Sequence, residues 1–305
     1  MKKIKFGTTN EEVSAVVFGC MRINGIEEKA AQSIVEKAVE VGINFFDHAD
    51  IYGKGECEEI FGRVLKNSSL KREDLWLQTK CGIRPGTFDF SKEHIISSVE
   101  GSLKRLGVDH LDSLLLHRPD TLMEPEEIAA AFDQLHQEGK VRYFGVSNQK
   151  PLQIELLKKY VGQPLQANQL QFGIKHTGMI DSGIYVNMTN EPSVDHDGSI
   201  LEYSRLNDMT IQAWSPYQYG FFEGVFLDND KFPELNAVLA EIAEKYQITK
   251  NGLASAWILR HPAKMQVITG TMKEFRIEEI AAAAEINLSR EDWYKIYEVA
   301  GNKLP

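Results

Sequence analysis

The stretch NFFDHADIYG, from Asn44 to Gly53, carries an apolar aromatic run straight into a group of polar side chains. Two aspartates, a histidine and a tyrosine follow the paired phenylalanines, and a glycine comes directly after them. This pattern is typical of a buried strand that delivers polar side chains to its open end. The stretch therefore predicts a strand whose C-terminal end places Asp47 and Tyr52 together in a site.

Around this stretch, short apolar runs alternate with longer segments whose apolar residues recur at helical spacing. In residues 27–42, for example, the apolar side chains form one stripe of a helix, and Gly42 stands where a helix C-terminus is expected. The chain contains eight such strand–helix units. Their expected strands are residues 15–21, 43–49, 75–82, 110–120, 141–148, 165–173, 210–216 and 265–270.

Strands that are apolar on both faces and joined by helical crossovers predict an α/β fold with a parallel sheet covered by helices. Eight repeats of roughly 30 to 40 residues favour a closed (β/α)8 TIM barrel over the alternative, an open doubly wound sheet. The GxGxxG loop of the open sheet is missing after the first strand, and Glu58 replaces the third glycine in GKGECE. We expect one domain over residues 1–305, with an N-terminal β-hairpin and an extra C-terminal helix at residues 290–300.

The composition excludes several kinds of partner. A formal net charge of -10 and a pI near 5.4 argue against broad binding of nucleic acid or of anionic membranes, because both need a cationic face. The three cysteines stand far apart, and the N-terminus has no apolar run of a secretory signal. No stretch reaches membrane-spanning length. We therefore expect a cytoplasmic protein with reduced thiols, a monomer or a weak homo-oligomer.

Polar residues collect at the predicted C-terminal ends of the strands, which converge on one mouth in a barrel of this kind. The residues at these ends are Asp47, Tyr52, Lys80, His117, Ser147, Asn148, Gln169 and Trp214.

The first four of these residues suggest acid–base chemistry. A tyrosine has an ordinary pKa near 10, and bringing it towards 7 takes roughly 4 kcal/mol of preferential stabilisation of the phenolate. The ammonium group of Lys80 would provide that stabilisation, and Asp47 would keep the lysine charged. His117 can donate a hydrogen bond to a carbonyl oxygen. Each residue alone has an ordinary structural explanation, but the four together predict a catalytic site.

A metal site is the alternative interpretation of DHAD together with His117. Such a metal-dependent hydrolase needs several ligands around one cation, and the lysine in their midst would repel it. The segment at residues 173–198 also contains His176, His196, Asp195 and Asp197, but their spacing matches no strong metal motif. We therefore expect no metal and interpret the segment as a solvated loop that can border the substrate pocket.

Seven motifs, in order along the chain, resemble the aldo-keto reductase family, in particular its bacterial NADPH-dependent branch. They are FFDHADIYG, TKCG, LLLHRPD, FGVSN, NQLQF, AWSP and ITGTMKEFRIEE. The resemblance implies a (β/α)8 barrel that reduces aldehydes or ketones with NADPH or NADH and no metal. By position, Tyr52 would be the general acid, Lys80 and Asp47 would tune it, and His117 would orient the carbonyl.

The resemblance also implies a cofactor site. The carboxamide would be held by Ser147, Asn148 and Gln169, and the ring would lie against Trp214, where many members have tyrosine; Ser215 and Pro216 also match, whereas Gln218 departs from a glycine-richer loop. After the last strand, Thr271, Arg276 and Glu279 match phosphate and adenine contacts, but Gly270 replaces a frequent lysine and Ile280 a frequent asparagine. Arg276 and Lys273 favour NADPH, with NADH as the alternative.

Two questions about function stay open at this stage. Some relatives with the same barrel act mainly as cofactor-binding regulatory subunits or redox sensors, although the complete set of four polar residues favours catalysis. The resemblance implies a small carbonyl substrate, and the short C-terminal tail predicts an open mouth, with Met21, Tyr219 or Phe222 as apolar wall candidates. Arg118 either attracts an acidic substrate or pairs with Asp120.

Overall fold

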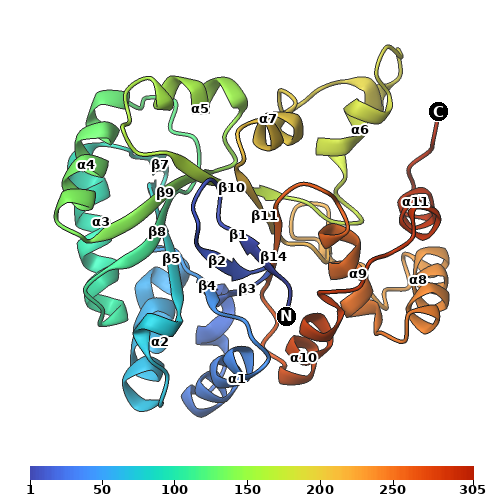
Figure 1. The fold of residues 1–305 in the computed structure, drawn as a ribbon, viewed down its shortest axis with the longest axis horizontal. Helices are drawn as coiled ribbons and strands as arrows, with labels where there is room; N and C mark the ends of the chain where they lie inside the picture. The colour runs from blue at the N-terminus through green and yellow to red at the C-terminus, as the bar shows by residue number, and fades with distance from the viewer.

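The computed structural model describes all 305 residues and closes eight parallel strands into a barrel (Figure 1). The predicted (β/α)8 fold is therefore confirmed, and the open sheet is excluded. In order around the barrel the strands are β3 (Val16–Gly19), β4 (Phe45–Asp47), β5 (Trp76–Cys81), β8 (Leu111–Leu116), β9 (Val141–Ser147), β10 (Leu165–Gln171), β11 (Thr210–Trp214) and β14 (Met265–Thr269).

Helices surround the barrel because their apolar side chains must be buried. Helix α1 shows this, since Ala31, Ile34, Val35 and Ala38 are all buried and Gly42 adopts a left-handed φ of 89° just beyond the helix end. The helices are α1 (Glu28–Glu40), α2 (Glu56–Asn67), α3 (Lys92–Leu106), α4 (Pro125–Gln137), α5 (Pro151–Lys158), α6 (Gly178–Ile184), α7 (Ile200–Leu206), α8 (Pro233–Lys245), α9 (Lys250–Leu259), α10 (Glu274–Ala283) and α11 (Arg290–Val299).

The N-terminal hairpin closes the end of the barrel at which the strands begin. It pairs β1 (Lys3–Lys5) with β2 (Glu12–Ser14) in antiparallel register, and the fully buried Phe6 follows β1. The Phe6 ring centroid lies 4.8 Å from that of Trp76 and 5.9 Å from that of Phe45. These rings belong to a small apolar cluster that is separate from the main core. The floor of the barrel is thus an aromatic plug.

Short elements complete the loops. Two small hairpins pair β6 (Ile83–Arg84) with β7 (Thr87–Phe88) and β12 (Gln218–Tyr219) with β13 (Gly224–Val225). Four 3-10 turns are present: η1 (Cys20–Gly25), η2 (Tyr52–Gly55), η3 (Arg72–Asp74) and η4 (Glu191–Ser193).

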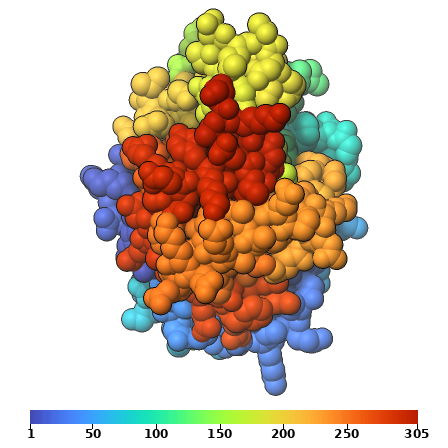
Figure 2. Space-filling view, turned by 90° about the vertical axis from the view of Figure 1, so that its right-hand side faces the viewer, coloured from blue at the N-terminus to red at the C-terminus, as the bar shows by residue number.

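The segment at residues 173–198 contains α6, a helix that the sequence interpretation missed. The helix is stabilised by the end of the chain, which Figure 2 shows lying directly beside it. The Tyr297 hydroxyl donates to Asp181 over 2.8 Å, and the Tyr185 hydroxyl donates to the Lys303 carbonyl. This helix had no strong sequence signal because its partners lie more than a hundred residues away.

Among the helices, none combines the length and the apolar character that crossing a membrane requires.

Candidate active site

A buried ion pair lies inside the barrel mouth. Lys80 on β5 donates to both carboxylate oxygens of Asp47 on β4, each over 2.7 Å, and to the carbonyl of His48 over 2.7 Å. Lys80 is fully buried and Asp47 is 2% exposed. Burial lowers the pKa of Lys80, but the Asp47 carboxylate and the Tyr52 phenol outweigh it, so the net shift is upward. The lysine is therefore held as an ammonium ion.

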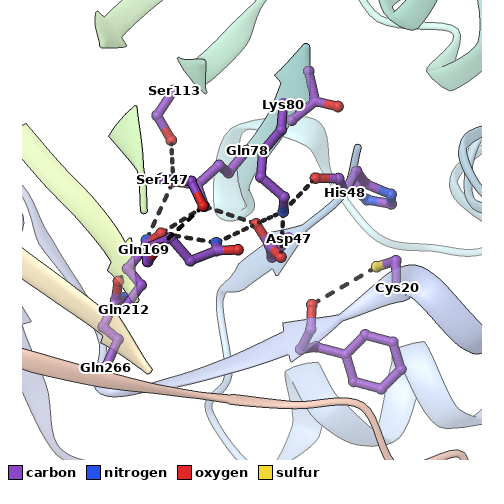
Figure 3. Close-up of polar contacts among 12 residues, drawn as sticks. Cys20, Asp47, His48, Gln78, Lys80, Ser113, Ser147, Gln169, Gln212 and Gln266 are labelled. Carbon is purple, nitrogen blue, oxygen red and sulfur yellow. Dashed lines mark hydrogen bonds and ion pairs between the residues drawn. The ribbon is translucent and has the colours of Figure 1, made fainter. Parts of the chain in front are cut away.

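Below the ion pair, buried amides form a connected layer (Figure 3). Gln78 on β5 donates to Asp47 over 2.7 Å and to Gln212 on β11 over 2.8 Å. Gln212 in turn donates to Gln266 on β14 over 2.9 Å. Gln169 on β10 also donates to Asp47, over 3.1 Å. The Asp47 carboxylate thus accepts two amide hydrogen bonds in addition to those from Lys80.

Acceptors at both ends of this layer fix the orientation of its amides. The Gln266 amide nitrogen donates to the Ser14 carbonyl over 2.9 Å, which leaves its oxygen to accept from Gln212. The Gln212 oxygen then accepts from Gln78, whose nitrogen also meets the Asp47 carboxylate. Since a carbonyl and a carboxylate only accept, no single amide can flip without leaving a buried group unpaired.

The Tyr52 ring lies above the ion pair at the start of η2. The Lys80 nitrogen is 5.1 Å from the centroid of this ring. Burial raises the pKa of Tyr52, and the charge of Lys80 opposes this rise without reversing it. The sequence-based expectation of a phenol tuned towards 7 is therefore wrong for this state, because sequence shows the nearby cation but not the desolvation. The phenol is protonated at neutral pH.

His117 lies beside Tyr52 at the end of β8. The two ring centroids are 5.9 Å apart at an interplanar angle of 81°. Burial, followed by the charges of Lys80 and Arg118, holds the pKa of His117 well below its usual value. A neutral imidazole at pH 7 can still donate one hydrogen bond, as orienting a carbonyl oxygen requires.

These groups open into a cavity of about 340 Å³ at the C-terminal face of the barrel. Asp47, Tyr52 and His117 line it, whereas Lys80 lies beneath its wall. Of the wall candidates, Met21 and Phe222 line the cavity, and Tyr219 does not. The residues expected to bind the cofactor that line the same cavity are Ser147, Asn148, Gln169, Trp214, Ser215, Pro216 and Gly270.

The groups expected at the nicotinamide hold one another in place. The Trp214 indole donates to the Asn148 side-chain oxygen over 3.1 Å, and the Asn148 amide donates to the Ser147 hydroxyl over 2.7 Å. Phe222 stacks on Trp214 at 6.1 Å. An aromatic face beside amide groups suits a flat ring that carries a carboxamide, so these residues fit a nicotinamide.

The loop after β14 leads away from the cavity. Thr271, Arg276 and Glu279 do not line it, but they follow Gly270, which does. The Arg276 Nε atom is buried without a hydrogen-bond partner, and Glu279 accepts from Asn251 over 2.8 Å. An unpaired buried arginine nitrogen in the first turn of α10, just after this loop, fits an anionic end of a dinucleotide.

Several contributing residues were not identified from the sequence. Arg22 lines the cavity and lies near Gly270, with 3.5 Å between its Nη1 atom and the Gly270 carbonyl oxygen. The glutamines at positions 78, 212 and 266 were missed because their contacts join strands far apart in the chain. The sequence did hold one signal for Arg22. Gly270 stands where many relatives have a lysine, and the glycine leaves space there for the side chain of another cation.

The residues of the 173–198 segment do not reach this cavity. Asp195 accepts the backbone N–H groups of Asp197, Gly198 and Ser199, so it stabilises a turn. His196 is exposed and lies 3.7 Å from Glu191. His176 pairs only through its backbone, with Gly173. The prediction that this segment borders the substrate pocket is wrong.

Fold, strand-end residues and cavity together define a (β/α)8 barrel with a polar cavity at its C-terminal face, and the chain belongs to the aldo/keto reductase family, whose model matches residues 15–300. The resemblance seen in the sequence is confirmed. The chain is 35% identical over 309 residues to an uncharacterized oxidoreductase, YcsN, of Bacillus subtilis, covering 96% of this chain and 97% of the relative. It is 33% identical over 306 residues to a 6-dehydroglucose reductase of Agrobacterium fabrum, covering 96% of both.

A solved structure agrees with this assignment. The thermostable aldo-keto reductase Tm1743, crystallised with the inhibitor epalrestat, matches with a TM-score of 0.79 and 26% identity over 98% of this chain and 100% of that one. The protein is therefore an oxidoreductase of a family whose chemistry is carbonyl reduction.

Proposed function

We propose that this protein reduces aldehydes and ketones to alcohols with NADPH, and that Tyr52 is the proton donor. One observation carries the proposal: a protonated phenol lies above a buried ammonium ion, 5.1 Å from nitrogen to ring centroid, at the wall of a cavity. A purely structural tyrosine needs no buried cation beneath it, and burying a cation is costly.

Each polar residue at the barrel mouth has a separate role in the proposed reaction. A reduced nicotinamide, when bound, supplies a hydride. Tyr52 gives its proton to the oxygen of the former carbonyl, and the resulting phenolate is stabilised by Lys80. Asp47 keeps Lys80 protonated before and after the transfer. Neutral His117 donates a hydrogen bond to the carbonyl oxygen and fixes its orientation.

Ser147, Asn148, Gln169 and Trp214 would hold the nicotinamide end, with Ser215, Pro216 and Gly270 along the cavity wall. Thr271, Arg276 and Glu279 would bind the other end, and the unpaired Arg276 Nε atom supports NADPH over NADH. Arg22 would supply the positive charge that a lysine at position 270 supplies in many relatives. Dissociation constants for both cofactors test this, and tighter binding of NADH would contradict it.

The test of the proton donor is Tyr52→Phe. We expect the variant to fold and to bind NADPH, and to lose kcat for a panel of aldehydes and ketones by about two to four orders of magnitude. Oxidation of NADPH followed by absorbance measures the loss, and calorimetry measures cofactor binding.

Tyr217→Phe is the matched control for this experiment. Tyr217 lines the same cavity, but its hydroxyl is hydrogen-bonded to Ser255 over 2.7 Å. The Tyr217→Phe variant also loses one hydroxyl, and its kcat should differ from that of the unmodified protein by no more than a few-fold. Equal kcat in the Tyr52→Phe variant and the unmodified protein would remove the assignment.

A further inference from the structure

The cavity contains an arginine whose charge is not neutralised by the protein. Arg118 follows His117 at the end of β8, is half-buried, and lines the cavity wall. It forms no ion pair, and its guanidinium donates no hydrogen bond to the protein. Its guanidinium carbon lies 5.5 Å from the centroid of the Trp214 ring. The guanidinium carries five N–H donors, and none of them has an acceptor in the protein.

The neighbouring carboxylate does not serve as the partner of Arg118. Asp120 accepts the backbone N–H of Phe90 over 3.0 Å and that of Leu122 over 2.9 Å, so both of its oxygens shape the loop. Burial lowers the pKa of Arg118, and only the Tyr52 phenol opposes this shift. The pairing that the sequence left open is therefore absent.

The charge balance of the cavity wall also favours an anion. Asp47 is the only carboxylate among the residues that line the cavity, and Lys80 already neutralises it. Arg22 and Arg118 remain as two unpaired cations, although the whole chain has a net charge of -10. A positive cavity in an acidic protein concentrates anionic ligands at its mouth.

Arg118 borders both the proposed cofactor site, through Trp214, and the groups that would meet the carbonyl. The cofactor groups lie at the ends of β9, β10 and β11 and after β14, whereas Arg118 stands beside His117 on β8. Its charge lowers the pKa of His117, and the Tyr52 phenol acts on the pKa of Arg118, so Arg118 lies within electrostatic reach of the groups that would meet the carbonyl. Arg22 lies instead near Gly270.

We infer that Arg118 is a specificity residue that binds a carboxylate on the substrate, so that the preferred substrates are carbonyl compounds that also carry a carboxylate. The inference rests on the proposed carbonyl reduction. The planar guanidinium matches a carboxylate through two parallel hydrogen bonds.

The test compares 4-carboxybenzaldehyde with 4-formylbenzamide, which has the same shape but no charge. In the unmodified protein we expect kcat/KM to be about ten- to a hundred-fold higher for the acid than for the amide. Arg118→Met keeps the length of the side chain and should abolish this preference, so that kcat/KM for the acid and for the amide become equal within about three-fold. Arg118→Lys should restore part of it. Arg205→Met removes an exposed arginine outside the cavity and is the matched control for net charge.

Binding provides a readout that is independent of turnover. With saturating NADP⁺, which cannot reduce the aldehyde, calorimetry should show tighter binding of the acid than of the amide, and equal binding in Arg118→Met. No preference in the unmodified protein, or a preference that survives Arg118→Met, would overturn the inference. Absence of turnover with both aldehydes would contradict the proposed function, and the binding comparison would still decide the role of Arg118.

Discussion

Asp47 and His48 are neighbours in the chain, yet they lie on opposite sides of the barrel wall. Asp47 points into the barrel, where its carboxylate accepts hydrogen bonds from Lys80, Gln78 and Gln169. His48 points outward towards α2, and its ring packs edge-on against Phe61 at 4.6 Å. Both ring nitrogens of His48 are buried without a partner. One strand end thus presents a fully paired charge and a completely unpaired imidazole.

The difference shows two ways in which a protein accommodates buried polar groups. A carboxylate cannot be buried alone, so it is surrounded by donors. An imidazole can instead lose its charge: burial, followed by the charge of Lys80, lowers the pKa of His48 to about 3. The stability of the inner side of the strand therefore depends on specific hydrogen-bond partners, and the stability of the outer side depends on pH.

The largest effect should come from removing the paired charge. Asp47→Leu leaves Lys80 buried without its anion, and we expect the free energy of unfolding to fall by about 3–5 kcal/mol, as measured by urea denaturation. The double variant Asp47→Leu, Lys80→Met should recover most of this loss because no buried charge remains. If the double variant is as unstable as the single one, packing rather than charge explains the effect.

The protein should become less stable in acid because of His48, on the outer side of the strand. Above pH 6.5 His48 is neutral in both folded and unfolded chains, whereas between 6.5 and about 3 only the unfolded chain takes up the proton. Stability should therefore be fully present above pH 6.5 and fall as the pH drops, by up to about 1.4 kcal/mol per unit from this residue.

His48→Phe isolates this contribution. The stability of the variant relative to the unmodified protein should rise as the pH is lowered from 7 to 5 in urea titrations, with exposed His196→Phe as the matched control. Asp50, whose pKa burial raises to about 6, is present in all three proteins and cancels in the comparison. A relative stability that does not change with pH would show that His48 is protonated in the folded protein.

A smaller effect is expected within the amide layer. Gln78→Leu removes one donor from Asp47 and leaves the Ser113 hydroxyl and the Gln212 amide short of a partner. We expect a loss of about 1–3 kcal/mol in the free energy of unfolding and a moderate decrease in kcat, because Lys80 and Gln169 still contact the carboxylate. Gln134→Leu, on the surface of α4, should cost less than about 0.5 kcal/mol. Equal losses in the two variants would contradict a specific role for the layer.

The sequence was sufficient for the barrel and for the four polar residues at its mouth, because each depends on a local pattern. Apolar runs between helical segments marked the strands, and Asp47, Lys80 and His117 stand at their ends. Strand alternation also implies that Asp47 and His48 face opposite sides, a consequence the sequence interpretation did not draw.

What the sequence could not provide depends on contacts across the barrel. Gln78 and Gln212 are 134 residues apart, and their hydrogen bond exists only because strand register brings them level. Helix α6 also depends on a contact between residues far apart in the sequence, because it is stabilised by the end of the chain. The direction of the Tyr52 pKa shift required the extent of burial, which no local motif encodes.

The aromatic plug at the N-terminal end of the barrel has a consequence for how ligands enter and leave. Since Phe6 and its neighbours seal the floor, the cavity is a blind well with a single opening. Two molecules bound in it together must exchange in sequence, and whichever lies deeper enters first and departs last.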